Sequence, residues 1–496
     1  MMQRTSRTLL ILAVLVVLGK TPAFSENALS EGSRSDDGQP SVVSQPPASP
    51  EMIHKSVDRA LEFLTLDAAK WRQERGCATC HHGVMTVWAL SEARRQGYAV
   101  PAEPLADTVK WTKDLLVPQF SKPRDPRWGY NFVSLPGIYL GIMSQTLPIL
   151  SRDEGNRVAV HLANHQEEDG AWLVPPQNAN TSPPTWESRE TIALWALLAW
   201  EPYVPADPQA AAAARAAREK VVTWLANSRP AEITQELSLR LLLDIREGRT
   251  ADQIQPKIDE LLARQNPDGG WSQFKELPSD AYATGQLLWI LSFSGIPPDD
   301  PQIRRAISYL VANQQENGSW PMTPRAISGP NASKKRNPVP ITYLGAAWAT
   351  LGIVRFVPPN LDIGTRQKLA FDFIRSFGGS YETDPNGTEK PVVAIKIGVE
   401  IDDDQLGTLA KLLPAFPQLK SLQLKSPMIT DIGAAHLKRV FQLRNLSLEQ
   451  AAITDAGLMR LNALTGLEVL NLKETKITDA GVADFQRASP TVKVQR

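Results

Sequence analysis

Cysteine, long apolar runs and an excess of charge of either sign are all scarce in this sequence. Only two of its 496 residues are cysteine, and 53 basic residues balance 53 acidic ones. Without a positive excess the chain offers no surface for nucleic acid, and the one basic run, residues 334–336, is typical of a solvated loop. Beyond the N-terminus no stretch approaches the roughly 18 apolar residues of a membrane helix, so we expect no transmembrane segment after signal cleavage.

The N-terminus has the features of an export signal. Arg4 and Arg7 precede an apolar run over residues 9–18, and Ala23 and Ser25 supply the small residues of a cleavage site. Residues 1–25 are therefore predicted to be a signal peptide, and the mature protein is expected to be exported, in the periplasm or outside the cell. Residues 26–50, rich in Ser, Pro, Gln and Asp, are predicted to be a disordered linker because they contain too little apolar surface to form a core.

Both cysteines belong to one motif, Cys77-Ala-Thr-Cys80-His81. This is the spacing of haem c attachment: each thiol can form a thioether with one vinyl group of haem, and His81 can then ligate the iron as its proximal ligand. An exported compartment suits this chemistry. Two other interpretations stay open, a local disulfide and half of a zinc site completed by His82 or by a distant residue.

The range 51–385 contains a repeated pattern, Q-x-x-x-G-x-W. Its three copies begin at Gln166, Gln265 and Gln314. A leucine lies four positions before each Gln, and weaker echoes of that leucine fill the intervals at Leu64, Leu115 and Leu225. Each copy follows a helical stretch and precedes an apolar helix, so the pattern predicts six or seven helical hairpins. In each hairpin a glycine turn joins an outer to an inner helix, and the Gln amide and Trp ring can tie that turn to the neighbouring hairpin.

These copies resemble the QW repeats of squalene-hopene cyclases and of other terpene cyclases and prenyltransferases. The resemblance covers roughly two thirds of the chain and implies an α/α toroid (an α6-α6 barrel), in which an inner ring of helices lies within an outer ring around a cavity. Triterpene cyclases of this type use an Asp in a D-x-D-D sequence as their acid. The toroid range lacks that sequence, and the nearest match, at residues 402–404, falls in the C-terminal repeats and is expected to be structural.

The alignment places the haem motif in a specific hairpin. When Leu64 is matched to the leucines of the other hairpins, Cys77 and Cys80 fall where those hairpins have their QW turn. All QW turns of a toroid face one rim, so the haem is expected at or over one mouth of the cavity. His81 then opens an inner helix that ends before Gly97.

Two residues next to the QW turns are candidates for a sixth iron ligand, His165 and Met322. His82 and Met85 are poor candidates, because on the same helix they approach from the same side as His81. The alternative is a five-coordinate haem with an open site, which suits peroxide or gas chemistry rather than electron relay.

The range 391–496 repeats with a strict period of 24 residues. The period is seen in Leu419, Leu443 and Leu467, and again in Asp431, Asp455 and Asp479. Each unit is predicted to form a short strand followed by a turn whose Asp can cap the next helix. The repeats resemble the cysteine-free bacterial form of leucine-rich repeat, whose concave strand face usually binds proteins. Binding of a partner protein and packing against the toroid both remain open.

The sequence therefore predicts a mainly α chain, an α/α toroid followed by a short α/β leucine-rich-repeat array. The leading hypothesis is an exported c-type haem protein in electron transfer or redox sensing, served by a redox partner protein. Cys77 and Cys80 would anchor the porphyrin and His81 would ligate the iron. Two alternatives are an isoprenoid-binding or isoprenoid-modifying toroid, and a protein-interaction scaffold in which the two cysteines form a disulfide.

Overall fold

The computed structural model describes most of the chain after the N-terminal segment, namely residues 47–76, 82–122, 134–147, 149–173, 188–200, 203, 205–228, 233–275, 277–323, 339–387 and 389–496. The chain divides into two units, Met1–Val43 and Ser44–Arg496, and every described residue lies in the second. The predicted signal peptide and most of the predicted linker therefore lie outside the described residues. Among those that are described, no helix is both long and apolar enough to cross a membrane.

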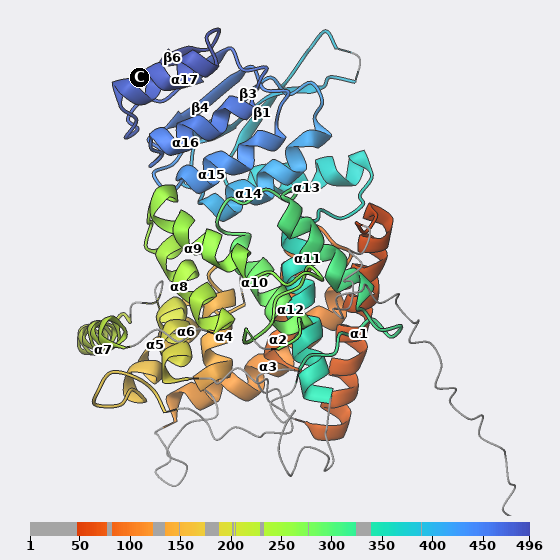
Figure 1. The fold of residues 1–496 in the computed structure, drawn as a ribbon, viewed down its shortest axis with the longest axis vertical. Coiled ribbons are helices and arrows are strands. Elements are labelled where there is room, and N and C mark those ends of the chain that lie inside the picture. The colour runs from red at the N-terminus through yellow and green to blue at the C-terminus, as the bar shows by residue number, and fades with distance from the viewer. Residues whose placement is uncertain are drawn as a thin grey trace, which may run out of the picture. The chain divides into compact units, whose positions relative to one another are not determined.

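Helices alternate along the chain between an inner and an outer ring (Figure 1). The inner helices are α2 (Val84–Arg95), α4 (Ser134–Met143), α6 (Arg189–Trp200), α8 (Thr234–Arg246), α10 (Ala281–Leu291) and α12 (Val339–Phe356). The outer helices are α1 (Pro50–Arg75), α3 (Ala102–Leu116) with the 3-10 turn η1 (Val117–Ser121), α5 (Arg152–Asn164), α7 (Pro208–Asn227), α9 (Ala251–Ala263) and α11 (Pro301–Ala312). Each inner helix packs against the next, and α12 packs against α2, so the described helices form a closed α/α toroid of six hairpins.

The helices of the inner ring are apolar over more of their surface than those of the outer ring. Inner helix α6 is buried at every position from Glu190 to Trp200, as expected for a helix enclosed on all sides. Outer helix α11 buries Ile303, Ile307 and Leu310, spaced at four and three residues, and exposes Arg304 and Arg305 in its first half. Its first turn is capped by Asp300, whose carboxylate accepts hydrogen bonds from two backbone amides.

The QW turns join the hairpins in the same way at all three copies. The indole Nε1 atoms of Trp172, Trp271 and Trp320 donate to the carbonyls of Leu162, Leu261 and Leu310, at 3.0, 2.9 and 2.6 Å. The Gln amides donate to their own turn and to the next outer helix, at the carbonyls of Ala217, Gln302 and Ser56. The prediction is thus correct for Gln, whereas each Trp ties the turn to its own outer helix.

The turn of the sixth hairpin closes the ring. Gln314 Nε2 lies 2.8 Å from the carbonyl of Ser56 in α1, and Gly318 packs against the same helix. Gly318 has φ of 85°, and a Cβ there would lie 2.2 Å from the carbonyl oxygen of Arg59. Only glycine accepts both this backbone conformation and this approach.

One of the predicted leucine echoes is wrong by one residue. Leu64 and Leu225 are buried as expected, but Leu115 is 38% exposed while Leu116 is only 6% exposed. Helix α3 passes into η1 at Val117, so Gln119 lies in a 3-10 turn and is not the start of a QW turn. The tighter 3-10 geometry changes the spacing between buried positions.

The C-terminal part is a six-stranded sheet, in the order β1 to β6, with helices between its parallel strands. The strands are β1 (Ser380–Thr383), β2 (Val392–Ile397), β3 (Ser421–Lys425), β4 (Asn445–Glu449), β5 (Val469–Asn471) and β6 (Lys493–Gln495). The helices are α13 (Ile363–Ser376), α14 (Asp403–Leu412), α15 (Asp431–His436), α16 (Asp455–Arg460) and α17 (Asp479–Ala488), with 3-10 turns η2 (Leu413–Ala415), η3 (Leu437–Arg439) and η4 (Leu461–Ala463).

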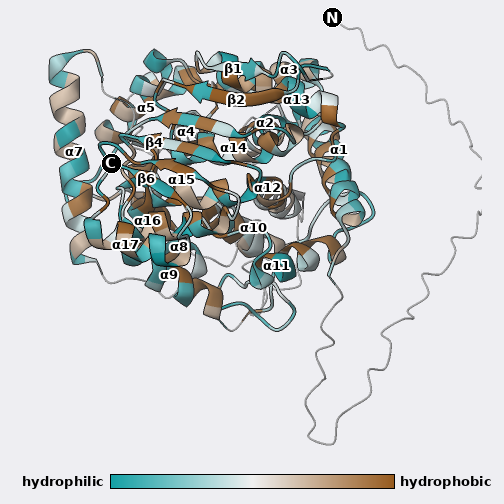
Figure 2. Cartoon of the chain, turned by 90° about the horizontal axis from the view of Figure 1, so that it is seen from above, coloured by the Kyte–Doolittle hydropathy of each residue, from teal (hydrophilic) through white to brown (hydrophobic). Residues whose placement is uncertain are grey.

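We call this part, from α13 to β6, the strand-helix array. Strand β1 is antiparallel to β2 and the other neighbours are parallel. Buried leucines alternate with polar residues along the strands, as the hydropathy colours show (Figure 2). Ala370 and Ile374 of α13 belong to the same hydrophobic core as the strands, so this core extends beyond the predicted range 391–496.

Aspartates join successive units of the array. Asp403 accepts hydrogen bonds from the backbone N and Oγ1 of Thr430, at 2.8 and 2.6 Å. The corresponding pairs one and two units later are Asp431 with Thr454 and Asp455 with Thr478. The expectation that the Asp caps its own helix is wrong, because the preceding Thr occupies the N-cap and the Asp reaches the next unit.

Candidate cofactor site and toroid lumen

The cysteine motif lies in the connection between outer helix α1 and inner helix α2. Cys77, Cys80 and His81 are outside the described residues, so only the flanks of the motif are described. On one side α1 ends at Arg75, and Gly76 with φ of 65° donates its N–H to the carbonyl of Arg72. On the other side α2 begins at Val84, after a turn at residues 82 and 83 and not at His81 as predicted, and it ends at Arg95, before Gly97 as predicted.

His82, which follows the motif directly, is held by three side chains. Its Nε2 lies 3.0 Å from Asp67 Oδ2, and its ring lies between those of Trp71 and Tyr343, with centroids 4.1 and 4.0 Å away. Burial lowers the pKa of His82, although Asp67 acts in the opposite direction. The His82 ring is therefore held by residues of α1 and α12 directly next to the motif.

Tyr343 connects the same region to the inner ring. Its hydroxyl donates to the carbonyl of Leu64 in α1 at 2.9 Å and is also hydrogen-bonded to Thr86 Oγ1 in α2. Complete burial raises the pKa of this phenol. Residues of α1, α2 and α12 therefore fix the chain next to the motif, and no pattern within one element of the sequence indicated this cluster.

The two proposed distal ligands lie on different hairpins. His165 ends α5 in the third hairpin, where its Nδ1 is 2.8 Å from the carbonyl of His161 and its ring stacks on that of His161. Burial, together with His165, lowers the pKa of His161 to about 4. Met322 follows the QW turn of the sixth hairpin, is buried, and packs beside Gly345 of α12.

The hairpin order separates these candidates. The sixth hairpin packs directly against the first, through contacts of α11 and α12 with α1. The third hairpin is separated from the first by the second, whose η1 contacts α5. The structure therefore brings Met322, and not His165, to the hairpin next to the cysteine motif.

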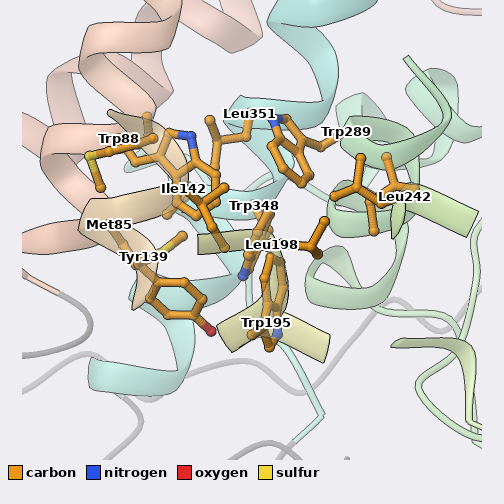
Figure 3. Packing of buried hydrophobic residues seen from close by; sticks show 14 of the residues in the cluster. Met85, Trp88, Tyr139, Ile142, Trp195, Leu198, Leu242, Trp289, Trp348 and Leu351 are labelled. Atoms are coloured by element: carbon orange, nitrogen blue, oxygen red, sulfur yellow. The ribbon is translucent and has the colours of Figure 1, made fainter. Parts of the chain in front are cut away.

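Aromatic side chains from all sides fill the centre of the toroid (Figure 3). Trp348 of α12 is fully buried, and its ring centroid lies 5.4, 5.7 and 6.1 Å from those of Trp88, Trp289 and Trp195. Tyr139 and Tyr282 extend the cluster, each 6.5 Å from Trp348. The resemblance implied a cavity at this level, but packed rings occupy it.

Two buried indoles of this cluster retain unused donors. The Nε1 atoms of Trp195 and Trp348 have no hydrogen-bond partner among the described residues. Gln235 Nε2 donates to the Tyr282 hydroxyl at 3.0 Å, while its own Oε1 lacks a described partner. The lumen therefore combines apolar ring faces with a few polar atoms.

Other polar residues that the sequence places at the start of inner helices have structural roles or lie outside the described part. Residues 186 and 187 are not described. Arg189 pairs with Asp169 at 2.6 Å and packs over Trp224. These contacts tie the QW turn of the third hairpin to α7. Asp280 caps α10 and accepts a hydrogen bond from Gln273. Burial raises the pKa of Asp280, although these hydrogen bonds act in the opposite direction.

Comparison with known proteins gives one local relative. No protein-family model matches the chain. Over 107 residues, 22% of this chain, the sequence is 28% identical to a squalene-hopene cyclase of Bradyrhizobium diazoefficiens. The match covers 16% of that enzyme, so the chain spans about a sixth of the length of the curated relative.

Solved structures with related helix arrangements are more distant in sequence. A type II terpene cyclase from Scytonema is 14% identical, with 62% of this chain and 98% of that chain covered and a TM-score of 0.37. An unsaturated glucuronyl hydrolase from Streptococcus agalactiae is 9% identical, with 63% and 94% covered and a TM-score of 0.42. TM-scores this low do not establish a common fold. The terpene-cyclase-like character of the scaffold rests on the closed double ring of helices and on the local sequence similarity.

Proposed function

We propose that this chain is an exported c-type haem protein built on a terpene-cyclase-like toroid, and that it works in electron transfer or redox sensing. The observation that carries the proposal is that both cysteines of the chain stand in one C-x-x-C-H sequence. Its position supports the proposal, because the motif lies between α1 and α2, where three other hairpins have QW turns. The predicted signal peptide supplies the compartment in which haem c is attached.

The described flanks fit a bulky group at this turn. A Cβ added to Gly76 would meet nothing within 4 Å, so the end of α1 is open where the motif begins. His81, which directly follows Cys80, would ligate the iron as the histidine of the C-x-x-C-H sequence. Cys77 and Cys80 would hold the porphyrin by thioether bonds. A bound haem c would supply one-electron chemistry.

For the sixth position we favour Met322 over His165, because the sixth hairpin adjoins the first. Met322 is held against Gly345 in a buried site, which would limit the motion of its thioether. An open sixth position is the remaining alternative. Near-infrared magnetic circular dichroism of the wild type, Met322→Leu and His165→Ala distinguishes the three cases, since only loss of the true ligand changes the axial-ligand signature.

The decisive test is a reduced pyridine-haemochrome spectrum of protein exported from a host with cytochrome c maturation. We expect a c-type spectrum that survives acid-acetone extraction, and its loss in the Cys77→Ser/Cys80→Ser variant. A His82→Gln variant is the matched control, because it should keep covalent haem. Correctly exported protein without covalent haem would refute the proposal, and thiol titration with and without reductant would then test the disulfide.

A second candidate function has one observation in its favour. The local similarity to a squalene-hopene cyclase favours an isoprenoid ligand, without the D-x-D-D acid of the cyclases, and such a ligand would bind outside the packed rings of the lumen. In this case mass spectrometry of an organic extract from purified protein should find a prenyl lipid in stoichiometric amount. Its absence, together with covalent haem, would exclude this function.

We also infer that the strand-helix array is a set of leucine-rich repeats that binds a protein partner. The support is the 24-residue period and the row of polar residues that the sheet register places side by side, Lys396, Gln423, Ser447, Asn471 and Gln495. A redox partner would suit such a polar face. Cross-linking from Gln423→Cys with a photoreactive reagent in the native host, and from the opposite helical face as control, tests this inference.

A further inference from the structure

A cluster of cationic side chains surrounds a small cavity where the strand-helix array packs on the toroid. The cavity has a volume of about 30 Å³ and lies between the C-terminal ends of α10 and α12 and the elements α14, α15 and η3. Its charged lining consists of Arg355, Lys411, Lys438 and Arg439 with one carboxylate, Asp404. We call it the junction cavity. Four cations therefore face one acid.

The one acid, Asp404, already forms ion pairs with two arginines. Arg355 pairs with Asp404 and, at 3.3 Å, with Glu92, while Arg95 lies 3.0 Å from the second oxygen of Asp404. Although burial alone would raise the pKa of Asp404, Arg355 and Arg95 hold it well below its usual range. The carboxylate is thus ionised and already paired with two arginines, although its Oδ2 makes no hydrogen bond among the described residues.

Among the described residues, Lys411 has no acidic partner of its own. Its Nζ donates to Gln96 Oε1 at 2.6 Å and to the backbone carbonyl of Arg355, both of which are neutral oxygens. Arg439 has no ion pair among the described residues, because nearby Asp299 pairs with Lys438, at 3.7 Å. Lys411 and Arg439 are half-buried, and a cation withdrawn from water without a counter-charge is costly, so such a site either loses a proton or binds an anion.

Burial and the cations of the cavity lower the pKa values of two groups that line it. Burial, followed by Arg355, Arg439 and Arg95, lowers the pKa of Lys411. Burial, followed by Lys411 and Arg355, lowers the pKa of His436 to about 3. Burial is the larger cause of both shifts and the cations of the cavity add to it, so an anion bound there would oppose the second contribution.

We propose that the junction cavity binds one halide-sized anion, chloride in the cell, held by Lys411 and Arg439. A volume of about 30 Å³ is enough for one particle of this size. The anion lies against residues of both the toroid and the array. It therefore links α14 to η3 within the array, at a cavity that Arg355 of α12 also lines.

The test is the thermal unfolding of the full chain in chloride, bromide or gluconate at constant ionic strength. We expect the Tm to rise by on the order of 2 °C between zero and 100 mM chloride, with saturation, and bromide to act alike. Lys411→Met and Arg439→Gln should abolish the dependence on chloride. Lys420→Met, which removes an exposed lysine of the same array, should keep it.

A second measurement needs no variant. Binding to the wild type should broaden the ³⁵Cl resonance of the solution, and added bromide should reverse the broadening in competition. Equal Tm values in chloride and gluconate, with no bromide-sensitive broadening, would overturn the proposal and leave Lys411 as a neutral amine. A chloride effect that persists in both cavity variants would also overturn it, because the anion would then bind elsewhere.

Discussion

Replacement of Gly318 by alanine tests whether the toroid is closed by its sixth QW turn. The new Cβ would lie 2.2 Å from the carbonyl oxygen of Arg59, a backbone atom of α1, and 3.2 Å from the Cβ of the same residue. Alanine at φ of 85° also carries the penalty of the left-handed region, about 1–2 kcal/mol. The collision must then be relieved by moving the turn away from α1, which adds about 1–3 kcal/mol, as overpacking does.

The chain offers a matched control for the backbone penalty. Gly248, in the turn between α8 and α9, has φ of 71°, and a Cβ there would meet nothing within 4 Å. Gly248→Ala should therefore lose about 1 kcal/mol of unfolding free energy, and Gly318→Ala about 3–4 kcal/mol. The difference between the two variants measures the contact with α1 alone.

Urea unfolding followed by tryptophan fluorescence and far-ultraviolet circular dichroism gives both free energies. If the variants unfold at the same urea concentration, with unchanged slopes, the sixth turn does not press on α1 and the reasoning on ring closure is refuted. A third variant, Gln314→Ala, removes the hydrogen bonds to Ser56 and Gly318 without adding bulk. It should fall between the two glycine variants.

Two further predictions concern the lumen and the array. Trp348→Ala should cost about 3–5 kcal/mol in the same urea assay, because its ring packs against several others in the centre of the toroid, whereas half-buried Trp224→Ala should cost far less. Burial raises the pKa of Asp403 to about 7, above its unfolded value, so its contribution to stability is present below about pH 4 and is lost as pH rises to 7, by up to about 1.4 kcal/mol per unit. Asp403→Asn should flatten that part of the pH-stability curve, and an unchanged slope would contradict the assignment.

The repeat pattern predicted the toroid because one physical requirement recurs in it. Each QW turn needs a glycine where backbone approaches backbone, a Gln that bonds two carbonyls, and a Trp that reaches the leucine four positions before the Gln. These requirements lie within about ten residues, so they leave a local signature in the sequence. The signature fails where geometry changes locally, as at Leu115, where η1 shifts the buried position to Leu116.

Contacts between distant elements left no such signature. His82 meets Asp67 and Tyr343 from α1 and α12, and Lys411 meets Gln96 and Arg355 from α2 and α12. Each of these residues is unremarkable in its own segment, and only the closed ring brings them together. The filled lumen is similar, since five of the six inner helices supply its rings. The cysteine motif stays a prediction from sequence, because it lies outside the described residues.

The contact between Gln314 and Ser56, which closes the ring, determines when during synthesis and folding the first hairpin is secured. These partners are 258 positions apart, so the first hairpin is made, and leaves the ribosome, long before the turn that secures it exists. A ring closed by so distant a contact is also expected to close slowly once the whole chain is present. During that interval Cys77 and Cys80 belong to an unfinished ring, which gives any enzyme that modifies them a period of access before the last hairpin is in place.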